Sequence, residues 1–176
     1  GANIEFTSPG ITPVTSSDFS LGLNNAPTDI TAAGSVTVDN PFTITFTDEN
    51  NWQSNINSIT YDGNVVDNAA YNTAISGEIT FTPSLSTALQ VAGTADLIIS
   101  SDGFNNSSPV SQTIGHGSAK NIVMVTEPTG PSVNGGQLQD QPVVKLQDLY
   151  NNDCTTDNST SVTVAKGDTG NWTLGG

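Results

Sequence analysis

The stretch from residue 42 to residue 63 constrains the fold more than any other part of the chain. Phe42, Ile44 and Phe46 alternate with three threonines, so the apolar side chains share one face of an extended strand. The run ends at an acidic turn, and a second alternating run leads into Asp-Gly, a dipeptide that favours a tight hairpin. The pattern predicts antiparallel strands with one buried face, and nothing in the chain predicts a long helix.

The acidic turn is expected to hold one short helical turn near residues 49–56. Trp52 and Ile56 are four positions apart, which places them on the same helical face, and Asp48 is a suitable N-cap. Large side chains at such positions usually anchor a core. The predicted structural anchors are Trp52, Ile56, Phe46, Tyr61 and Trp172.

Short strands separated by turn residues recur along the chain, and this spacing is typical of an all-β sandwich. Residues 29–116 contain enough strands for one complete sandwich module, whereas residues 117–176 contain about four, fewer than the roughly seven of a full Ig-type sandwich. Residues 1–28 read as strands followed by a linker. The predicted fold class is therefore all-β, with serial sandwich modules, one complete and one partial.

The charge balance excludes several classes of partner. The chain has 3 basic and 17 acidic residues and a net charge of −14, so it repels nucleic acid and anionic lipid. No apolar run approaches the ~20 residues of a membrane helix, so membrane insertion is not predicted. The chain lacks a signal peptide and an initial Met, so we expect a mature product or an excised piece. The single cysteine, Cys154, excludes an internal disulfide.

An oxygen-rich loop is the candidate metal site. Calcium prefers several carboxylate and amide oxygens that lie close together in the chain, although turns favour the same residue types for backbone reasons. The candidate calcium ligands are Asp148, Asn151, Asn152, Asp153 and Asp157. Four sequons are candidate glycosylation sites if the source glycosylates its surface proteins. Their asparagines are Asn105, Asn106, Asn158 and Asn171.

The sequence contains no catalytic centre, and no cofactor other than calcium is expected. His116 lies between two glycines in a linker, and Cys154 has no base close in sequence. A haem-ligating pair of His116 and Met124 lacks an evident apolar slot. An isopeptide crosslink at Lys145 is not expected, because its side chain alternates with Val144 and Leu146 and points to water.

Residues 29–114 resemble the haemoglobin-interacting domain, a short β-rich module found in tandem on secreted bacterial proteins. The resemblance implies a surface module, with haemoglobin contact as the precedent for its function. The matching features are Ile44–Asp48, Trp52, Ile56, Ile59–Gly63, Tyr71, Glu78–Phe81, Ala92-Gly93, Asp96–Ile99, Gly103-Phe104 and Gln112–Ile114.

The two ends of the chain resemble pieces of bacterial Ig-like repeats. Residues 120–176 are similar to the first half of such a repeat through Val125–Pro128, Gly135–Gln137 and Val143–Asn152, with Asn151 where glycine is commoner. Residues 1–24 are similar to the closing strands. The resemblance implies that residues 1–24 pack on a sheet like that of residues 120–176, in the same or another copy.

These observations predict a non-enzymatic, secreted or cell-surface structural and adhesive module. We expect it to belong to a tandem-repeat surface protein, a filament or a surface layer and to assemble through strand and domain contacts, because open sheet edges invite pairing. The expected partners are copies of itself or neighbouring repeats. The alternative is a ligand-binding module that contacts a host or environmental protein, haemoglobin for example, or a carbohydrate.

Overall fold

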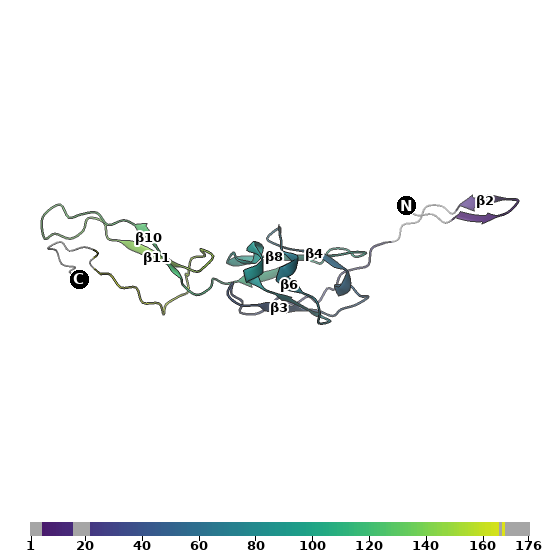
Figure 1. Ribbon diagram of the computed structural model, residues 1–176, viewed down its shortest axis with the longest axis horizontal. Helices are drawn as coiled ribbons and strands as arrows, with labels where there is room; N and C mark the ends of the chain where they lie inside the picture. The colour runs from purple at the N-terminus through teal and green to yellow at the C-terminus, as the bar shows by residue number, and fades with distance from the viewer. Residues whose placement is uncertain (1–4, 16–21, 166, 168–176) are drawn as a thin grey trace.

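The computed structural model describes residues 5–15, 22–165 and 167 (Figure 1). Its strands and 3-10 turns are short. In chain order they are β1 (Glu5–Ser8), β2 (Ile11–Thr15), β3 (Phe42–Thr45), η1 (Gln53–Asn55), β4 (Ile56–Tyr61), β5 (Asn64–Val65), η2 (Asn68–Ala70), β6 (Tyr71–Asn72), β7 (Glu78–Phe81), η3 (Pro83–Leu85), η4 (Thr87–Leu89), β8 (Gly93–Ser101), β9 (Val110–Ile114), β10 (Asn121–Thr126) and β11 (Val143–Gln147).

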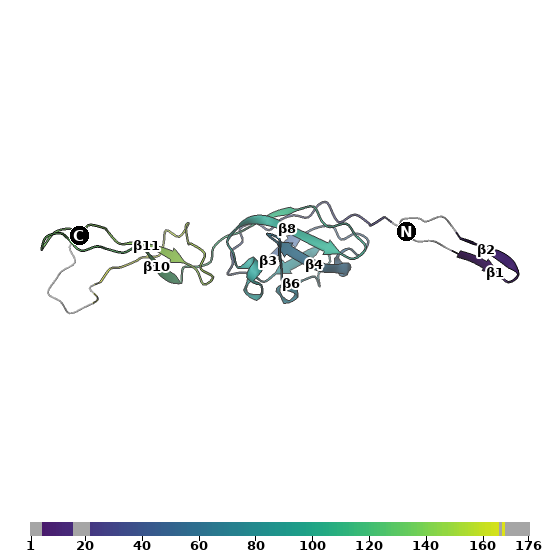
Figure 2. The same ribbon diagram turned by 90° about the horizontal axis from the view of Figure 1, so that it is seen from above.

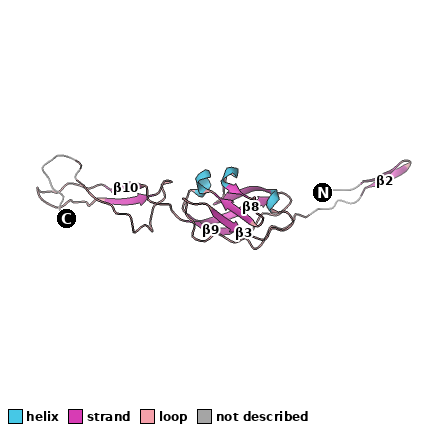
Figure 3. Cartoon of the chain, turned by 60° about the horizontal axis from the view of Figure 1, so that its bottom comes forward, coloured by secondary structure: helices cyan, strands magenta, loops and turns pink. Residues whose placement is uncertain are grey.

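The central module, residues 29–115, is built from two antiparallel sheets (Figure 3). One sheet has the strand order β3-β7-β6 and the other β5-β4-β8-β9. Alternate residues of both sheets meet in one apolar core, as the strand period requires. The fully buried side chains include Ile44, Ile59, Ile79, Phe81, Leu97, Ile99 and Ile114. The predicted all-β fold class is confirmed.

The alternation that opens the module sets the register of β3 against β7. Phe42 pairs with Phe81, and the two rings stack with their centroids 5.0 Å apart. On the opposite face, the hydroxyls of Thr43 and Thr80 are hydrogen-bonded at 2.9 Å. One face of this sheet therefore forms core, while threonines stabilise the other through cross-strand pairs.

Trp52 closes the core beneath η1. Its side chain is fully buried and meets Phe46 edge-on, with the ring centroids 5.0 Å apart. The helical turn is a single 3-10 turn with Trp52 as its N-cap and Ile56 as its C-cap, so the predictions of Asp48 as N-cap and of a helical face shared by Trp52 and Ile56 are wrong. Asp48 still supports the turn, because its Oδ1 accepts a hydrogen bond from the backbone N–H of Gln53 at 3.1 Å. Tyr61 is also buried, and Ile56 packs against the core while partly exposed.

Residues 29–38 contain the runs 29–33 and 35–38, which the sequence predicts as two short strands, but neither run forms a regular strand. They make only isolated bridges, Thr31 to Thr45 and Thr37 to Gly115. Side-chain hydrogen bonds hold this segment in place of a strand ladder. The Asp29 carboxylate accepts a hydrogen bond from the N–H of Thr47 at 3.0 Å. The Gln112 side chain accepts from the N–H of Ala33 and donates to the Ala33 carbonyl. The edge segment is therefore held to the sandwich by polar side chains.

Two further two-stranded sheets flank the module, β1-β2 before it and β10-β11 after it (Figures 1 and 2). Residues 161–164, one of the roughly four strands expected in the second unit, are irregular. The expected strand at 171–174, which includes Trp172 and Asn171, lies outside the described residues.

Candidate functional site

The most elaborate polar arrangement is the joint between the central module and the second unit, residues 118–165. The joint comprises residues 115–118 and the loop 148–157. Asp148 is its centre, with a fully buried side chain. Its carboxylate accepts hydrogen bonds from the backbone N–H groups of Gly117 at 2.8 Å, Tyr150 at 2.9 Å and Asn152 at 2.9 Å. The Asn152 side-chain amide donates a fourth at 2.9 Å.

These donors determine the charge state of Asp148. Burial alone raises the pKa of the carboxyl, but the hydrogen bonds from Gly117, Asn152 and Tyr150 outweigh it, so the pKa lies below its ordinary value. The buried group is thus a carboxylate whose acceptors are matched by N–H donors. It fixes the loop to the segment that leaves the central module.

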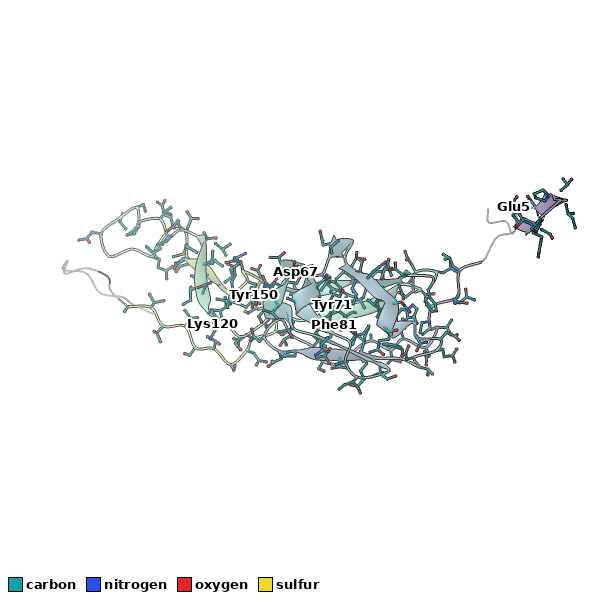
Figure 4. All side chains as sticks on the ribbon, turned by 45° about the vertical axis from the view of Figure 1, so that its right-hand side comes forward. Glu5, Asp67, Tyr71, Phe81, Lys120 and Tyr150 are labelled. Carbon is teal, nitrogen blue, oxygen red and sulfur yellow. The ribbon has the colours of Figure 1, made fainter. Side chains whose placement is uncertain are left out.

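Asn152 connects the two units directly. Its side-chain oxygen accepts a hydrogen bond from the backbone N–H of Ala92 at 2.8 Å, and its amide donates to the Gln90 carbonyl at 2.8 Å. On the other side of the joint, the Ser118 N–H donates to Asp39 at 2.7 Å. Tyr150 packs against the core of the module and lies at the junction in Figure 4. The second unit is therefore bonded to the module at several points.

His116 belongs to the same network. Its Nδ1 donates to the Gly117 carbonyl at 2.7 Å, and its Nε2 accepts from the Thr156 hydroxyl at 2.7 Å and from the Thr156 N–H at 3.3 Å. Gly117 is buried, and a Cβ there would collide with the Asp39 carboxylate. The glycine thus permits this close approach of Asp39, and the segment expected as a linker is held by hydrogen bonds.

The candidate calcium loop coincides with the joint. Asp153 forms an ion pair with Lys145 at 2.9 Å, and Asp157 accepts hydrogen bonds from Ser159 and Thr160. Asn151 adopts a left-handed conformation, φ 68°, which Asn tolerates. Most of these oxygens face donors of the protein itself. Within the described ranges, no cluster of three or more His, Cys, Asp or Glu side chains is placed to hold a metal ion. Calcium binding by this loop is untested.

The other predicted residues are dispersed. Asn105, Asn106 and Asn158 are exposed, and their glycosylation is untested. Cys154 is buried within the joint, and burial together with the nearby Asp148 carboxylate raises the pKa of its thiol. Met124 lies on β10, whereas His116 is engaged with Thr156.

Two residues that the sequence reasoning missed organise the module. The buried Gln53 donates to the carbonyls of residues 73, 75 and 78 and accepts from Gly77 N–H at 2.7 Å. The buried Gln112 binds Ala33, as described above. Gln112 alternates with Val110 and Ile114, so its place on the core face was readable from the sequence.

A shallow groove of about 500 Å³ adjoins the joint. Its walls come from the β4–β5 turn and from residues 87–95, and include Tyr61, Val65 and Val91. Val65 and Val91 are largely exposed. Ala92 lines the groove and also bonds Asn152, so the groove and the joint share a wall.

The fold and the joint together define a small β-sandwich module set in series with a second β unit. Residues 29–115 match the family described as heme-binding protein Shr-like, Hb-interacting domain, and this module belongs to that family. No curated protein matches the chain significantly. Among the residues described, no helix is long and apolar enough to cross a membrane.

A solved structure, Drosophila OTK extracellular domains 3-5, is 15% identical with a TM-score of 0.31. The match covers 72% of this chain and 48% of that chain, so this chain spans about half of that structure. A likeness at this level supports no argument about function.

Proposed function

We propose that the chain is a non-enzymatic structural and adhesive segment of an extracellular bacterial surface protein. In this proposal, the central module and the second unit form a stiff pair that presents the module at a fixed orientation. The observation that carries the proposal is the joint, in which the buried Asp148 carboxylate and the Asn152 amide bind backbone groups of both units.

The physical argument concerns the cost of opening the joint. Separating the units would leave the Asp148 carboxylate without the Gly117 donor and would expose Tyr150. Each lost hydrogen bond to a charged group costs about 1.5–3 kcal/mol. A joint with several such contacts resists bending, which suits a surface element that holds its binding face away from its attachment.

Light scattering and negative-stain electron microscopy of the purified chain test this function. We expect rod-like particles of uniform length, alone or in ordered linear assemblies. Particles that bend freely at residues 115–118 would contradict the structural role.

A second candidate function is recognition of a protein ligand by the central module. One support is the family to which residues 29–115 belong, because its description names Hb, haemoglobin. The other is the groove beside Tyr61, which has the exposed side chains of Val65 and Val91 in its walls. Exposed apolar groups in a concave surface are suited to a protein partner.

Biolayer interferometry with immobilised haemoglobin tests this candidate, with serum albumin as the comparison protein. If the groove binds haemoglobin, Val65→Asp and Val91→Asp weaken binding at least tenfold. The matched control is Ile75→Asp, which alters an equally exposed apolar side chain outside the groove. Absence of haemoglobin binding at micromolar concentration would reject this candidate.

A further inference from the structure

The β10-β11 sheet carries an apolar face with little cover. Ile122 pairs with Leu146 and Met124 pairs with Val144, so all four side chains lie on one face of the sheet. Ile122 is 60% exposed, Met124 45% and Val144 39%, while Leu146 is half-buried. A contiguous apolar face on so small a sheet is typical of a surface that another element covers.

The opposite face of the same sheet carries polar side chains that contact another part of the chain. There Asn121 pairs with Gln147 and Val123 pairs with Lys145. Lys145 and Gln147 both contact the Asp153 carboxylate, at 2.9 Å each. The loop that forms the joint therefore contacts this face at Lys145 and Gln147, whereas the side chains of Ile122, Met124 and Val144 on the apolar face stay exposed.

The β1-β2 hairpin is the complementary element. Every side chain described in its two strands is exposed, including Phe6 at 66% and Ile11 at 69%. An isolated two-stranded hairpin is marginally stable in water, so it too requires a layer to pack against. Glu5 is its only charged residue, and the apolar face of β10-β11 carries no charge that would oppose contact.

The two elements attach at opposite ends of the module. Asn24 bonds the backbone of Gly103 and Asn105, just after β8 ends, whereas Asn152 bonds Gln90 and Ala92, just before β8 begins. A nine-residue strand such as β8 is roughly 30 Å long. Figures 1 and 2 show the hairpin and the β10-β11 sheet on opposite sides of the module. Contact within one chain is therefore disfavoured.

We propose that the β1-β2 hairpin of one copy packs on the Ile122, Met124, Val144 and Leu146 face of a second copy. This inference rests on the proposed structural function and identifies its self-contact. Because the two surfaces differ, the contact is head-to-tail, and it extends into linear assemblies unless the rotation between copies closes a ring. The hairpin forms a second layer on the β10-β11 sheet, so the same contact covers the exposed hairpin of one copy and the apolar face of the other.

A complementation experiment tests the contact in the full chain. The first variant carries Ile122→Asp with Met124→Asp and keeps its hairpin, and the second lacks residues 1–15 and keeps its apolar face. We expect the wild type to associate as its concentration rises, each variant alone to stay monomeric, and their mixture to form a 1:1 heterodimer in sedimentation velocity. Ile75→Asp, on the module surface, is the control that retains association.

Three results would overturn the proposal. The first is self-association of the hairpin-less variant at wild-type strength, which indicates face-to-face pairing. The second is a wild type that stays monomeric throughout the concentration series. That result would indicate that the apolar face is covered within its own chain. The third is a mixture without heterodimer although both variants retain wild-type near-ultraviolet circular dichroism. Scattering from the monomeric hairpin-less variant measures joint stiffness separately, so failure of this contact and failure of the proposed function are distinguishable.

Discussion

The side-chain oxygen of Asn152 accepts a hydrogen bond from the backbone N–H of Ala92 at 2.8 Å, across 60 residues of sequence. The same side chain donates to Gln90 and to Asp148. One amide thus joins the edge of the central module to the buried carboxylate that organises the second unit. The orientation of the two units therefore depends on this side chain, together with the other contacts of the joint.

Protonation of Asp148 is expected to open the joint. Its folded-state pKa is lowered, so its contribution to stability is fully present above the unfolded value of about 3.9 and is lost as the pH falls through the folded value. Hydrogen exchange of the Gly117 amide, measured from pH 7 down to pH 2, checks this. We expect the protection conferred by the joint, corrected for intrinsic exchange, to decrease below about pH 4.

Asp148→Asn is the matched variant for that titration. It removes the charge while keeping a similar shape, and we expect it to weaken the joint by about 1–3 kcal/mol at pH 7 and to flatten the acid dependence. An acid profile identical to that of the wild type would show that another group controls the transition.

Gly77→Ala is expected to destabilise the central module. Gly77 has φ 79°, and a Cβ there would lie 2.7 Å from the Phe46 carbonyl oxygen. Strain and collision together predict a loss of about 2–3 kcal/mol in chemical unfolding. The control is Gly63→Ala, with φ 72° and open space around the Cβ, which costs about 1 kcal/mol. Equal losses for the two variants would refute the role assigned to the close approach.

Trp52→Ala is expected to cost about 3–5 kcal/mol, because it empties a fully buried site against Phe46. Trp52→Phe is expected to cost clearly less, since the indole N–H has no hydrogen-bond partner in the described part of the chain. Thermal melting of the two variants decides the matter. If Trp52→Ala were as stable as the wild type, Trp52 would not be an anchor of the core.

Calcium at the 148–157 loop would have to compete with N–H donors and with Lys145 for the same oxygens. We therefore expect millimolar calcium to leave the melting of the second unit unchanged relative to chelator. A calcium-dependent rise that disappears in Asp153→Asn would instead establish the metal site.

Alternation along the strands predicted the sandwich because each apolar residue of β3 and β8 has a defined partner face. The buried Gln112 shows the limit of that reasoning: its position was predictable, but its bond to Ala33 required knowing that residues 29–38 run beside β9 without forming a ladder.

The role of Asp148 could not be predicted from the sequence, for a different reason. Asp, Asn and turn residues in one loop predict calcium and backbone turns equally well. Only the approach of Gly117 and Ala92, distant in the chain, determines that the oxygens of Asp148 and Asn152 accept hydrogen bonds from N–H groups.

Small-angle X-ray scattering of the hairpin-less chain with and without Asn152→Ala tests the central claim most directly. The parent is expected to scatter as one rigid particle, and the variant as two units in variable orientation, because it loses both cross-unit bonds at about 1 kcal/mol each. Asn158→Ala, which alters an exposed amide, is the control. Identical flexible profiles for the parent and Asn152→Ala would contradict a fixed joint.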